Sequence, residues 1–220
     1  ENAYTVVSVK ELDHTTILNG FTVTDGNADK GSTAPCGSGG GIHIVEYNPD
    51  DGGRLILSEL LVAYNSADLP GGGIYVRRGA VTVEDSTIIN NTAVLGGGIA
   101  TSQELLTVIN TTIAGNSGRT GGGLCISFGG ADITNSVIVG NNASTTGGGI
   151  YMYGNGPVTV RSSSIVGNSA ETDGGGTYQH PILFQNSIVA LNSSPNVDNV
   201  CGSLKPGSSN NLFDVDPGFI

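Results

Sequence analysis

Gly96-Gly97-Gly98-Ile99 is one of six stretches in which three consecutive glycines open a short, mostly apolar segment. The other five are Gly39-Gly40-Gly41-Ile42, Gly71-Gly72-Gly73-Ile74, Gly121-Gly122-Gly123-Leu124, Gly147-Gly148-Gly149-Ile150 and Gly174-Gly175-Gly176-Thr177. Successive triplets begin 32, 25, 25, 26 and 27 residues apart. A period of this size is typical of a solenoid, in which each repeat buries its apolar residues by stacking on its neighbours.

A column of asparagines runs in step with the glycines. Its members lie 24 to 27 residues apart and are Asn65, Asn91, Asn116, Asn141, Asn168 and Asn192. The segment Gly20–Asn27 is interpreted as an earlier unit of the same kind. Two independent columns that share one period make a chance agreement implausible.

Apolar residues alternate with polar ones inside each repeat. Ten and eight residues before Asn91 lie Val81 and Val83, with Thr82 between them, and the other repeats follow this pattern. The same alternation follows the glycines, and a third short apolar segment precedes the asparagine. A period of two indicates strands with one face inward, so we predict three short strands per coil.

These features predict an all-β fold, because no segment shows the 3.6-residue periodicity of a helix. The consistent architecture is a parallel β-helix with about 25 residues per coil and six to seven coils, which forms a rod about 30–35 Å long. We expect one domain over residues 1–220. It divides into an initial coil over 1–38, regular coils over 39–192 and an exit segment over 193–220.

The two columns have physical roles at the corners of such a coil. An inward asparagine amide donates and accepts hydrogen bonds along the stack, so we predict a structural asparagine ladder. The glycines serve another corner, where a positive φ or a close approach of backbone excludes a Cβ. A further polar column, six residues before the asparagines, is expected to mark the remaining bend: Asp85, Asn110, Asn135, Ser162 and Asn186.

Composition narrows the classes of partner. The chain has 220 residues, 36 of them glycine, without the Gly-X-Y period of collagen, and its formal net charge is −11. Nucleic-acid phosphates repel such a chain, so we expect no nucleic-acid partner. No apolar run reaches the length of a transmembrane segment. Because the chain starts at Glu1 rather than Met, we expect a mature product or an excerpt of a longer protein.

The repeat motifs resemble a known group of proteins. Gly-Gly-Gly-Ile-Tyr at 147–151, Ser-Ile-Val at 164–166 and Gly-Asn-Ser-Ala at 167–170 are similar to the right-handed parallel β-helix repeats of bacterial surface and secreted proteins, including the polymorphic outer-membrane protein type. Residues 4–23 and 186–219 resemble the first and last coils of such proteins. The resemblance implies a right-handed β-helix in an extracellular or cell-surface setting. Members include adhesins, anchored surface proteins and polysaccharide-active enzymes, so the fold does not decide the function.

Catalytic groups are sparse on the predicted outward strand faces. On the strand that precedes the polar bend column, the outward residues with ionisable side chains are Glu84, Asp132 and Arg161. Glu84 and Asp132 lie two coils apart, about 10 Å, and no neighbouring coil adds a second acid. We therefore assign no catalytic residue and favour a protein without catalysis.

Aromatic residues after the glycines form a candidate carbohydrate face, made of Tyr151, Tyr153, Tyr178 and His180. Tyrosine rings stack on sugar rings, although neighbouring tyrosines also simply cover a strand surface. A threonine row of Thr82, Thr107 and Thr159 suggests an ice-binding face, but Asp132 interrupts it.

Metal and cofactor sites are not expected. His14, His43 and His180 lie in different coils without metal-ligand spacing. The acidic loop 46–51 offers oxygen ligands for calcium, but it lacks the ordered spacing of a dedicated calcium loop, and a solvated insertion is the simpler interpretation.

Three cysteines leave an odd count: Cys36, Cys125 and Cys201. Cys125 is predicted to point outward with the tyrosines. Cys36 and Cys201 lie at opposite ends of the rod, too far apart for a bridge within one chain, but they can meet between two chains stacked end to end. The open strand edges at both ends of a β-helix favour such stacking.

These observations lead to two functional hypotheses. The first is a non-catalytic extracellular structural or adhesive β-helix that assembles head to tail into filaments. The alternative is a carbohydrate-binding or polysaccharide-degrading β-helix, with a polysaccharide or a host cell-surface ligand as its partner.

Overall fold

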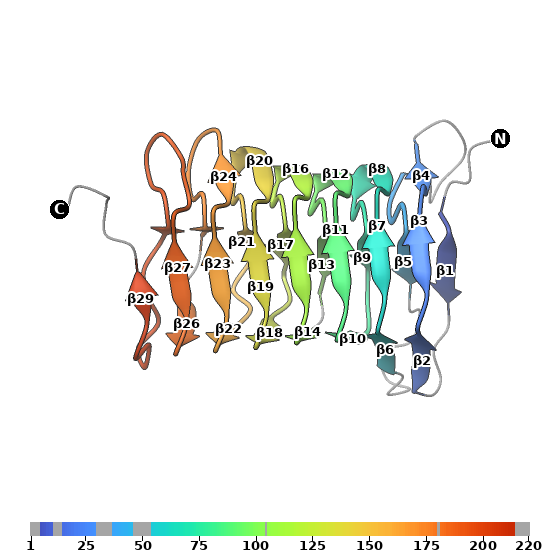
Figure 1. The fold of residues 1–220 in the computed structure, drawn as a ribbon, viewed down its shortest axis with the longest axis horizontal. Helices are drawn as coiled ribbons and strands as arrows, with labels where there is room; N and C mark the ends of the chain where they lie inside the picture. The colour runs from blue at the N-terminus through green and yellow to red at the C-terminus, as the bar shows by residue number, and fades with distance from the viewer. Residues whose placement is uncertain are drawn as a thin grey trace.

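The computed structural model describes residues 5–10, 15–29, 37–45, 54–103, 105–179 and 181–213. They form a right-handed parallel β-helix of about six turns, with about 26 residues per turn (Figure 1). Strands β1 (Val7–Lys10) and β29 (Leu212–Phe213) lie at opposite ends of the rod. Every regular element in this part of the chain is a strand, so it contains no helix long and apolar enough to cross a membrane. The predicted fold class is confirmed.

Four parallel sheets run along the rod, named A to D here in the order in which the chain meets them. Sheet A contains β1 (Val7–Lys10), β5 (Ile42–Val45), β9 (Ile74–Val76), β13 (Ile99–Ser102), β17 (Leu124–Ser127), β21 (Ile150–Tyr153), β25 (Thr177–Tyr178) and β28 (Val200–Cys201). Sheet B contains β2 (Thr16–Asn19), β6 (Arg54–Ser58), β10 (Ala80–Glu84), β14 (Leu106–Ile109), β18 (Ala131–Thr134), β22 (Val158–Arg161) and β26 (Ile182–Gln185).

Sheet C contains β3 (Thr22–Thr24), β7 (Leu61–Ala63), β11 (Thr87–Ile89), β15 (Thr112–Ala114), β19 (Val137–Val139), β23 (Ser164–Val166), β27 (Ile188–Ala190) and β29 (Leu212–Phe213). Sheet D contains β4 (Asn27–Ala28), β8 (Ser66–Pro70), β12 (Thr92–Leu95), β16 (Ser117–Thr120), β20 (Asn142–Thr146) and β24 (Ser169–Ala170). Strands β1 to β4 precede residue 39, and β28 and β29 follow residue 192. The sheets therefore run through both predicted boundaries of the regular coils.

The six turns from β1 to β24 thus have four strands each, and the prediction of three was wrong. The strand that sequence reasoning missed belongs to sheet D and follows the asparagine directly. Its inward position holds only a small residue, as in Ala28, Ala67, Ala93, Gly118, Ala143 and Ala170. One small residue per strand produces no apolar alternation, so this sheet leaves almost no signal in the hydrophobic pattern.

The core is a stack of aliphatic residues from sheets A, B and C. Equivalent positions lie in register from turn to turn, as in Ile74, Ile99 and Leu124 of sheet A, which are all 0% exposed. Thr101 interrupts this apolar set. Its hydroxyl oxygen Oγ1 is buried and has no hydrogen-bond partner among the described residues.

The asparagine column forms a continuous buried ladder. Nδ2 of Asn91 donates to Oδ1 of Asn116 over 3.0 Å and to the carbonyl oxygen of Val62 over 2.9 Å. The same Oδ1 of Asn116 accepts the backbone N–H of Asn91 over 2.9 Å. This pattern repeats from Asn65 to Asn192, so each amide closes the corner of its own turn and joins it to the next.

The N-terminal end of the ladder corrects one prediction. Gly26, not Asn27, occupies the ladder position of the first turn, and its N–H donates to Oδ1 of Asn65 over 2.9 Å. Asn27 lies one residue later, in β4, opposite Ser66. The interpretation of Gly20–Asn27 as a unit that ends on a ladder asparagine was therefore wrong.

The opposite end of the ladder gains a seventh amide, from Asn199. Nδ2 of Asn192 donates to Oδ1 of Asn199 over 2.9 Å, although the two residues are only 7 positions apart. Asn199 precedes β28 as Gly176 precedes β25, so it reaches the ladder from the position of the third glycine. The spacing of about 25 residues that identifies the other members therefore does not reveal it.

A second ladder, of hydroxyl groups, joins sheets B and C. The N–H of Ser136 donates to Oγ of Ser163 over 3.0 Å, and Oγ of Ser136 donates to the carbonyl oxygen of Thr134 over 2.8 Å. The column comprises Ser86, Thr111, Ser136, Ser163 and Ser187. Sequence reasoning missed it because serine and threonine occur throughout this chain.

Left-handed residues mark the bends just before both ladders. Asp85, Asn110, Asn135, Ser162 and Asn186 have φ between 48° and 52°, so the predicted third bend is confirmed. A second left-handed column precedes the asparagine ladder: Tyr64, Asn90, Gly115, Gly140, Gly167 and Leu191. Asparagine and glycine adopt this conformation most readily, which explains their frequency at both columns.

The glycine triplets combine both constraints expected of them. The first glycine of each triplet has φ between 60° and 76°. The second has no room for a side chain, because a Cβ on Gly97 would lie 2.7 Å from the carbonyl oxygen of Gly122 and closer still to that of Ser117. The third is crowded by the ladder, since a Cβ on Gly98 would lie 3.1 Å from Nδ2 of Asn116.

We predict that Asn116→Ala destabilises the fold by about 3–5 kcal/mol, because it leaves the buried amide of Asn91 and the carbonyl oxygen of Ile88 without their partners. The exposed amide of Asn142 provides a matched control, and Asn142→Ala is expected to cost less than about 1 kcal/mol. Urea unfolding followed by circular dichroism measures both. Equal losses in the two variants would contradict a special role for the ladder.

Two glycine substitutions distinguish the two reasons for glycine, namely lack of space for a Cβ and a left-handed backbone conformation. We expect Gly97→Ala to prevent folding, because the clash involves backbone carbonyl groups that cannot move. Gly140→Asn is expected to change stability by less than about 1 kcal/mol, since open space surrounds a Cβ there and Asn90 holds the same left-handed position two turns earlier. Soluble expression and the thermal midpoint of the two variants test this contrast, and a folded Gly97→Ala would contradict it.

Candidate functional site

The outward face of sheet B does not bring its acidic residues together. Asp132 lies between Thr107 and Thr159, whereas Glu84 belongs to the next outward column, opposite Ile109. The two carboxylates are thus separated by two turns and by two residues along the strand. Asp132 also interrupts the row of Thr82, Thr107 and Thr159, as the sequence indicates.

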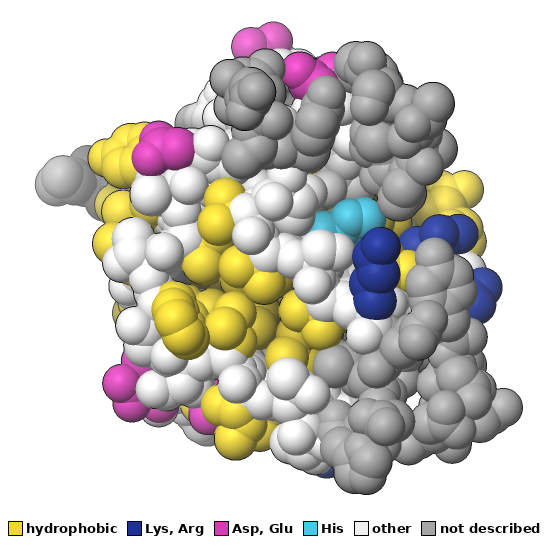
Figure 2. All heavy atoms as spheres, turned by 90° about the vertical axis from the view of Figure 1, so that its right-hand side faces the viewer, with side chains coloured by type: hydrophobic (Ala, Val, Ile, Leu, Met, Phe, Trp, Pro, Cys, Tyr) yellow, Lys and Arg dark blue, Asp and Glu magenta, His cyan; other side chains and the backbone are white. Residues whose placement is uncertain are grey.

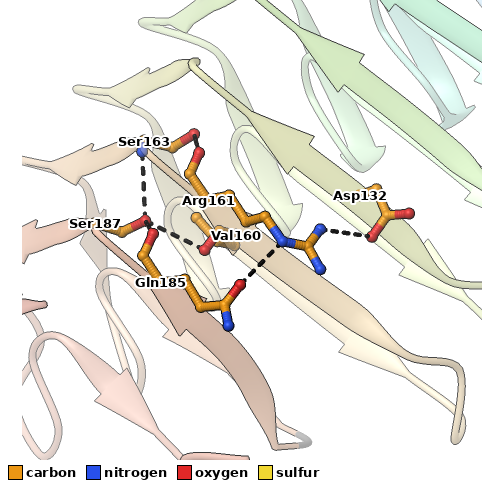
Figure 3. Close-up of polar contacts among 6 residues, drawn as sticks. All are labelled: Asp132, Val160, Arg161, Ser163, Gln185 and Ser187. Atoms are coloured by element: carbon orange, nitrogen blue, oxygen red, sulfur yellow. Dashed lines mark hydrogen bonds and ion pairs between the residues drawn. The ribbon is translucent and has the colours of Figure 1, made fainter. Parts of the chain in front are cut away.

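Asp132 has a basic neighbour instead of a second acid. Figure 3 shows the Arg161 guanidinium between Asp132 and Gln185: Nη1 lies 3.7 Å from Oδ1 of Asp132, and Nε donates to Oε1 of Gln185 over 3.0 Å. The two ion-pair side chains are 44% and 46% exposed, so the pair contributes at most about 1 kcal/mol. This cluster links three turns on the surface, beside the hydroxyl ladder of Ser163 and Ser187.

The outward face of sheet A carries two separate stacks of aromatic rings. One outward column runs in register through His43, Tyr75, Ala100, Cys125, Tyr151 and Tyr178. The ring centroids of His43 and Tyr75 are 5.4 Å apart. Those of Tyr151 and Tyr178 are 5.6 Å apart, with planes 7° from parallel. Between the two stacks lie two positions without a ring.

Those two positions form the floor of a hollow of about 240 Å³. The lining residues come from strands of sheets A and D and from the turn after β17: Pro70, Tyr75, Leu95, Ala100, Thr101, Ser102, Cys125, Ser127 and Phe128. Phe128 is held at the rim by an edge-to-face contact with Tyr153, with ring centroids 4.9 Å apart. Apolar groups therefore dominate this hollow, which sequence reasoning did not anticipate.

The predicted carbohydrate face is only partly a single surface. Tyr151 and Tyr178 stack directly on one another. Tyr153 is 52% exposed but lies in the next outward column, where its ring contacts Phe128. His180 lies outside the described residues.

Cys125 belongs to the outward column, as predicted, yet it is only 2% exposed because it lies at the floor of the hollow. Burial raises the pKa of its thiol to about 11, although the nearby hydroxyl of Ser127, 3.9 Å from Sγ, favours the thiolate. Cys201 lies further along the same column, opposite Tyr178, and is more accessible. Burial and, to a lesser degree, the charge of Asp173 raise the pKa of the Cys201 thiol. Cys36 lies outside the described residues, so its bridge to Cys201 stays a prediction.

His43 packs into the sheet and has no ligand geometry. It is 7% exposed, and its pKa is lowered by burial first and then by the positive charges of Lys10 and Arg77, so the ring is neutral at neutral pH. Within the part of the chain that the structure describes, no three His, Cys, Asp or Glu side chains gather as a metal site would require. His14 and the acidic loop 46–51 lie outside that part, so the calcium hypothesis stays open.

We predict that the cysteines differ in reactivity. Since the thiolate is the nucleophile, iodoacetamide at pH 8 should modify Cys201 at least about tenfold faster than Cys125, whose thiol is buried and protonated. The rate at Cys125 should keep rising as the pH approaches about 11. Peptide mass spectrometry resolves each cysteine, Cys36 included. A rate at Cys125 that levels off below pH 9 would contradict the assignment.

Comparison with known proteins agrees with the architecture. The searches of curated proteins and of solved structures return no match. A family model described as the right handed beta helix region matches residues 50–201, about two thirds of the chain. The matched range contains the glycine triplets from Gly71 onward and the whole asparagine ladder from Asn65 to Asn192. The chain therefore belongs to the right-handed β-helix family.

Proposed function

We propose that this chain is a non-catalytic structural or adhesive β-helix that works outside the cell and joins further copies head to tail. The observation that carries the proposal is the state of its N-terminal end, where no turn among the described residues precedes β1 to β4 to cover the core and the four strand edges. The outward faces then remain free to contact other molecules along the assembled rod.

The apolar core reaches the surface at this end. Val7, Val9 and Leu18 are inward residues of the first turn and are only partly buried. Their counterparts one turn later are 0% to 1% exposed: Ile42, Ile44 and Leu57. Figure 2 looks at this end and has hydrophobic side chains gathered near its centre. Such a patch favours association with another apolar surface.

The edge strands at this end have backbone groups that can pair with a further strand. Strands β1, β2, β3 and β4 are the outermost strands of sheets A, B, C and D. The amide of Val7 donates to the carbonyl oxygen of Gly41 over 2.9 Å. Since amides alternate in direction along a parallel strand, those of Ser8 and Lys10 point away from β5. An unpaired edge of this kind is a template for another strand.

The opposite end offers two matching edge strands, β28 in sheet A and β29 in sheet C. The last strands of sheets B and D, β26 and β24, are already paired by later residues of the same chain, through Leu204, Ser209 and Ser193. A second copy placed on the rod axis therefore continues sheets A and C, with parallel strand direction across the junction.

The extracellular setting rests on the resemblance to surface and secreted β-helices. The net charge of −11 makes the sides of neighbouring rods repel one another, which favours solubility. Attraction between copies is then confined to the apolar ends. A second candidate function is carbohydrate binding, which is favoured by the parallel Tyr151 and Tyr178 rings, because exposed aromatic faces stack on sugars.

We predict that Ser8→Pro weakens end-to-end association by at least about tenfold. Proline removes an outward edge amide without removing a hydrogen bond within the chain, and it is tolerated on edge strands. Ser8→Thr keeps the amide and is the matched control. Sedimentation velocity over a range of concentrations, with electron microscopy of the assemblies, measures the effect.

A wild-type protein that remains a monomer at every concentration would overturn the proposal. So would filaments that form equally well from Ser8→Pro. Non-reducing gel electrophoresis tests the accompanying prediction that a bridge between Cys36 and Cys201 joins neighbouring copies.

A further inference from the structure

We infer that the hollow on sheet A is a binding site for a small, uncharged, planar aromatic molecule, which completes an interrupted column of stacked rings. This inference does not depend on end-to-end assembly. It rests on the spacing of the rings, on the aromatic side chains that border the gap and on the chemistry of the lining.

The spacing leaves room for inserted rings. Residues at one position of successive turns are about 4.8 Å apart, so Tyr75 and Tyr151, three turns apart, are separated by about 14 Å. Within each stack, the centroid distances of 5.4 and 5.6 Å follow the same repeat. Ala100 and Cys125 hold the two intervening positions with side chains too small to fill them. The column thus has a gap the size of two rings.

Aromatic side chains border this gap along the column. The ring of Tyr151 lies within 7° of parallel to that of Tyr178, which covers one of its faces. The next position of the column on its other side is Cys125. The ring of Tyr75 contacts His43 on one side, and the next position of the column on its opposite side is Ala100. Tyr75 and the rim residue Phe128 line the hollow itself, so a planar molecule there contacts aromatic rings.

The lining is apolar and neutral. Pro70, Leu95 and Phe128 wall the hollow, and the described residues that line it include no Lys, Arg, Asp or Glu. The Cys125 thiol at the floor has a pKa of about 11, and burial also raises the pKa of Tyr75, so both groups are uncharged at neutral pH. A charged ligand would lose its hydration here without gaining a partner.

A planar aromatic molecule fits this chemistry better than a sugar does. A sugar ring also stacks on tyrosine, but its hydroxyl groups need several hydrogen-bond partners once they leave water. The described lining offers only hydroxyl groups as side-chain partners, those of Tyr75, Thr101, Ser102 and Ser127, and the last already lies 3.9 Å from the Cys125 thiol. Its volume of about 240 Å³ limits the occupant to one or two fused rings.

Indole is a suitable probe, because this chain contains no Trp and indole fluorescence can be excited selectively. We expect its fluorescence anisotropy to rise saturably with protein concentration. Ala100→Phe places a ring in the gap and should weaken indole binding at least about tenfold. Thr107→Phe adds the same ring at an outward position of sheet B and should leave binding unchanged. Circular dichroism checks that both variants are folded.

A second measurement uses the wild-type protein alone. Bound indole should cover Cys125 and slow its alkylation at least about threefold, while alkylation of Cys201 stays unchanged. Indole-3-acetate, which carries a negative charge, should protect less well than indole, and cellobiose should not protect. The inference is overturned if indole gives no saturable signal and no protection of Cys125, if Ala100→Phe binds indole as the wild type does, or if cellobiose protects better than indole.

Discussion

Every turn of this chain lies directly over the previous one at the strand spacing of about 4.8 Å, and this self-stacking constrains every other feature. A residue type suits a position only if it packs well against the residue at the same position of the next turn. Buried amides satisfy that condition because each one donates to the amide of the next turn and accepts from the previous one, as Asn116 does between Asn91 and Asn141. Glycine satisfies it where backbones touch, since a Cβ on Gly97 would meet the carbonyl groups of Ser117 and Gly122.

The same constraint explains which features the sequence reveals. Positions with a strict chemical requirement repeat visibly, so the glycine triplets, the asparagine column and the bend that contains Asn110 and Asn135 are predictable from spacing alone. The inward position of sheet D requires only a small residue, as at Ala93 and Gly118. Small residues are frequent throughout the sequence, so this column cannot be recognised from the sequence. Asn199 escapes detection for a different reason: it reaches the ladder from the position of the third glycine, outside the spacing of the column.

Stacking constrains the outward side chains less than the inward ones, so less of the candidate site could be predicted from the sequence. Register follows from the repeat, which correctly aligns Tyr151 with Tyr178. The burial of an outward residue depends on the size of its neighbours. Cys125 is buried because larger side chains surround it. The rim residue Phe128 lies in a turn with φ of 59°, where no repeat position predicts an aromatic ring. The ion pair of Asp132 with Arg161 joins adjacent columns, so it is not apparent from one column at a time.

Function in such a rod is to be sought where the repeat is broken, because identical turns present a uniform surface. One break is the first turn, where Val7 and Val9 keep their inward positions but are only partly buried, and where Gly26 stands in place of a ladder asparagine. The other is the column that passes from Tyr75 to Tyr151 through two small residues, which leaves a lined hollow between two stacks of rings. The hollow does not disturb the ladder, since Asn91, Asn116 and Asn141 run unbroken through these turns. A repeat scaffold can therefore alter its outward columns independently of the buried interactions that hold its turns together.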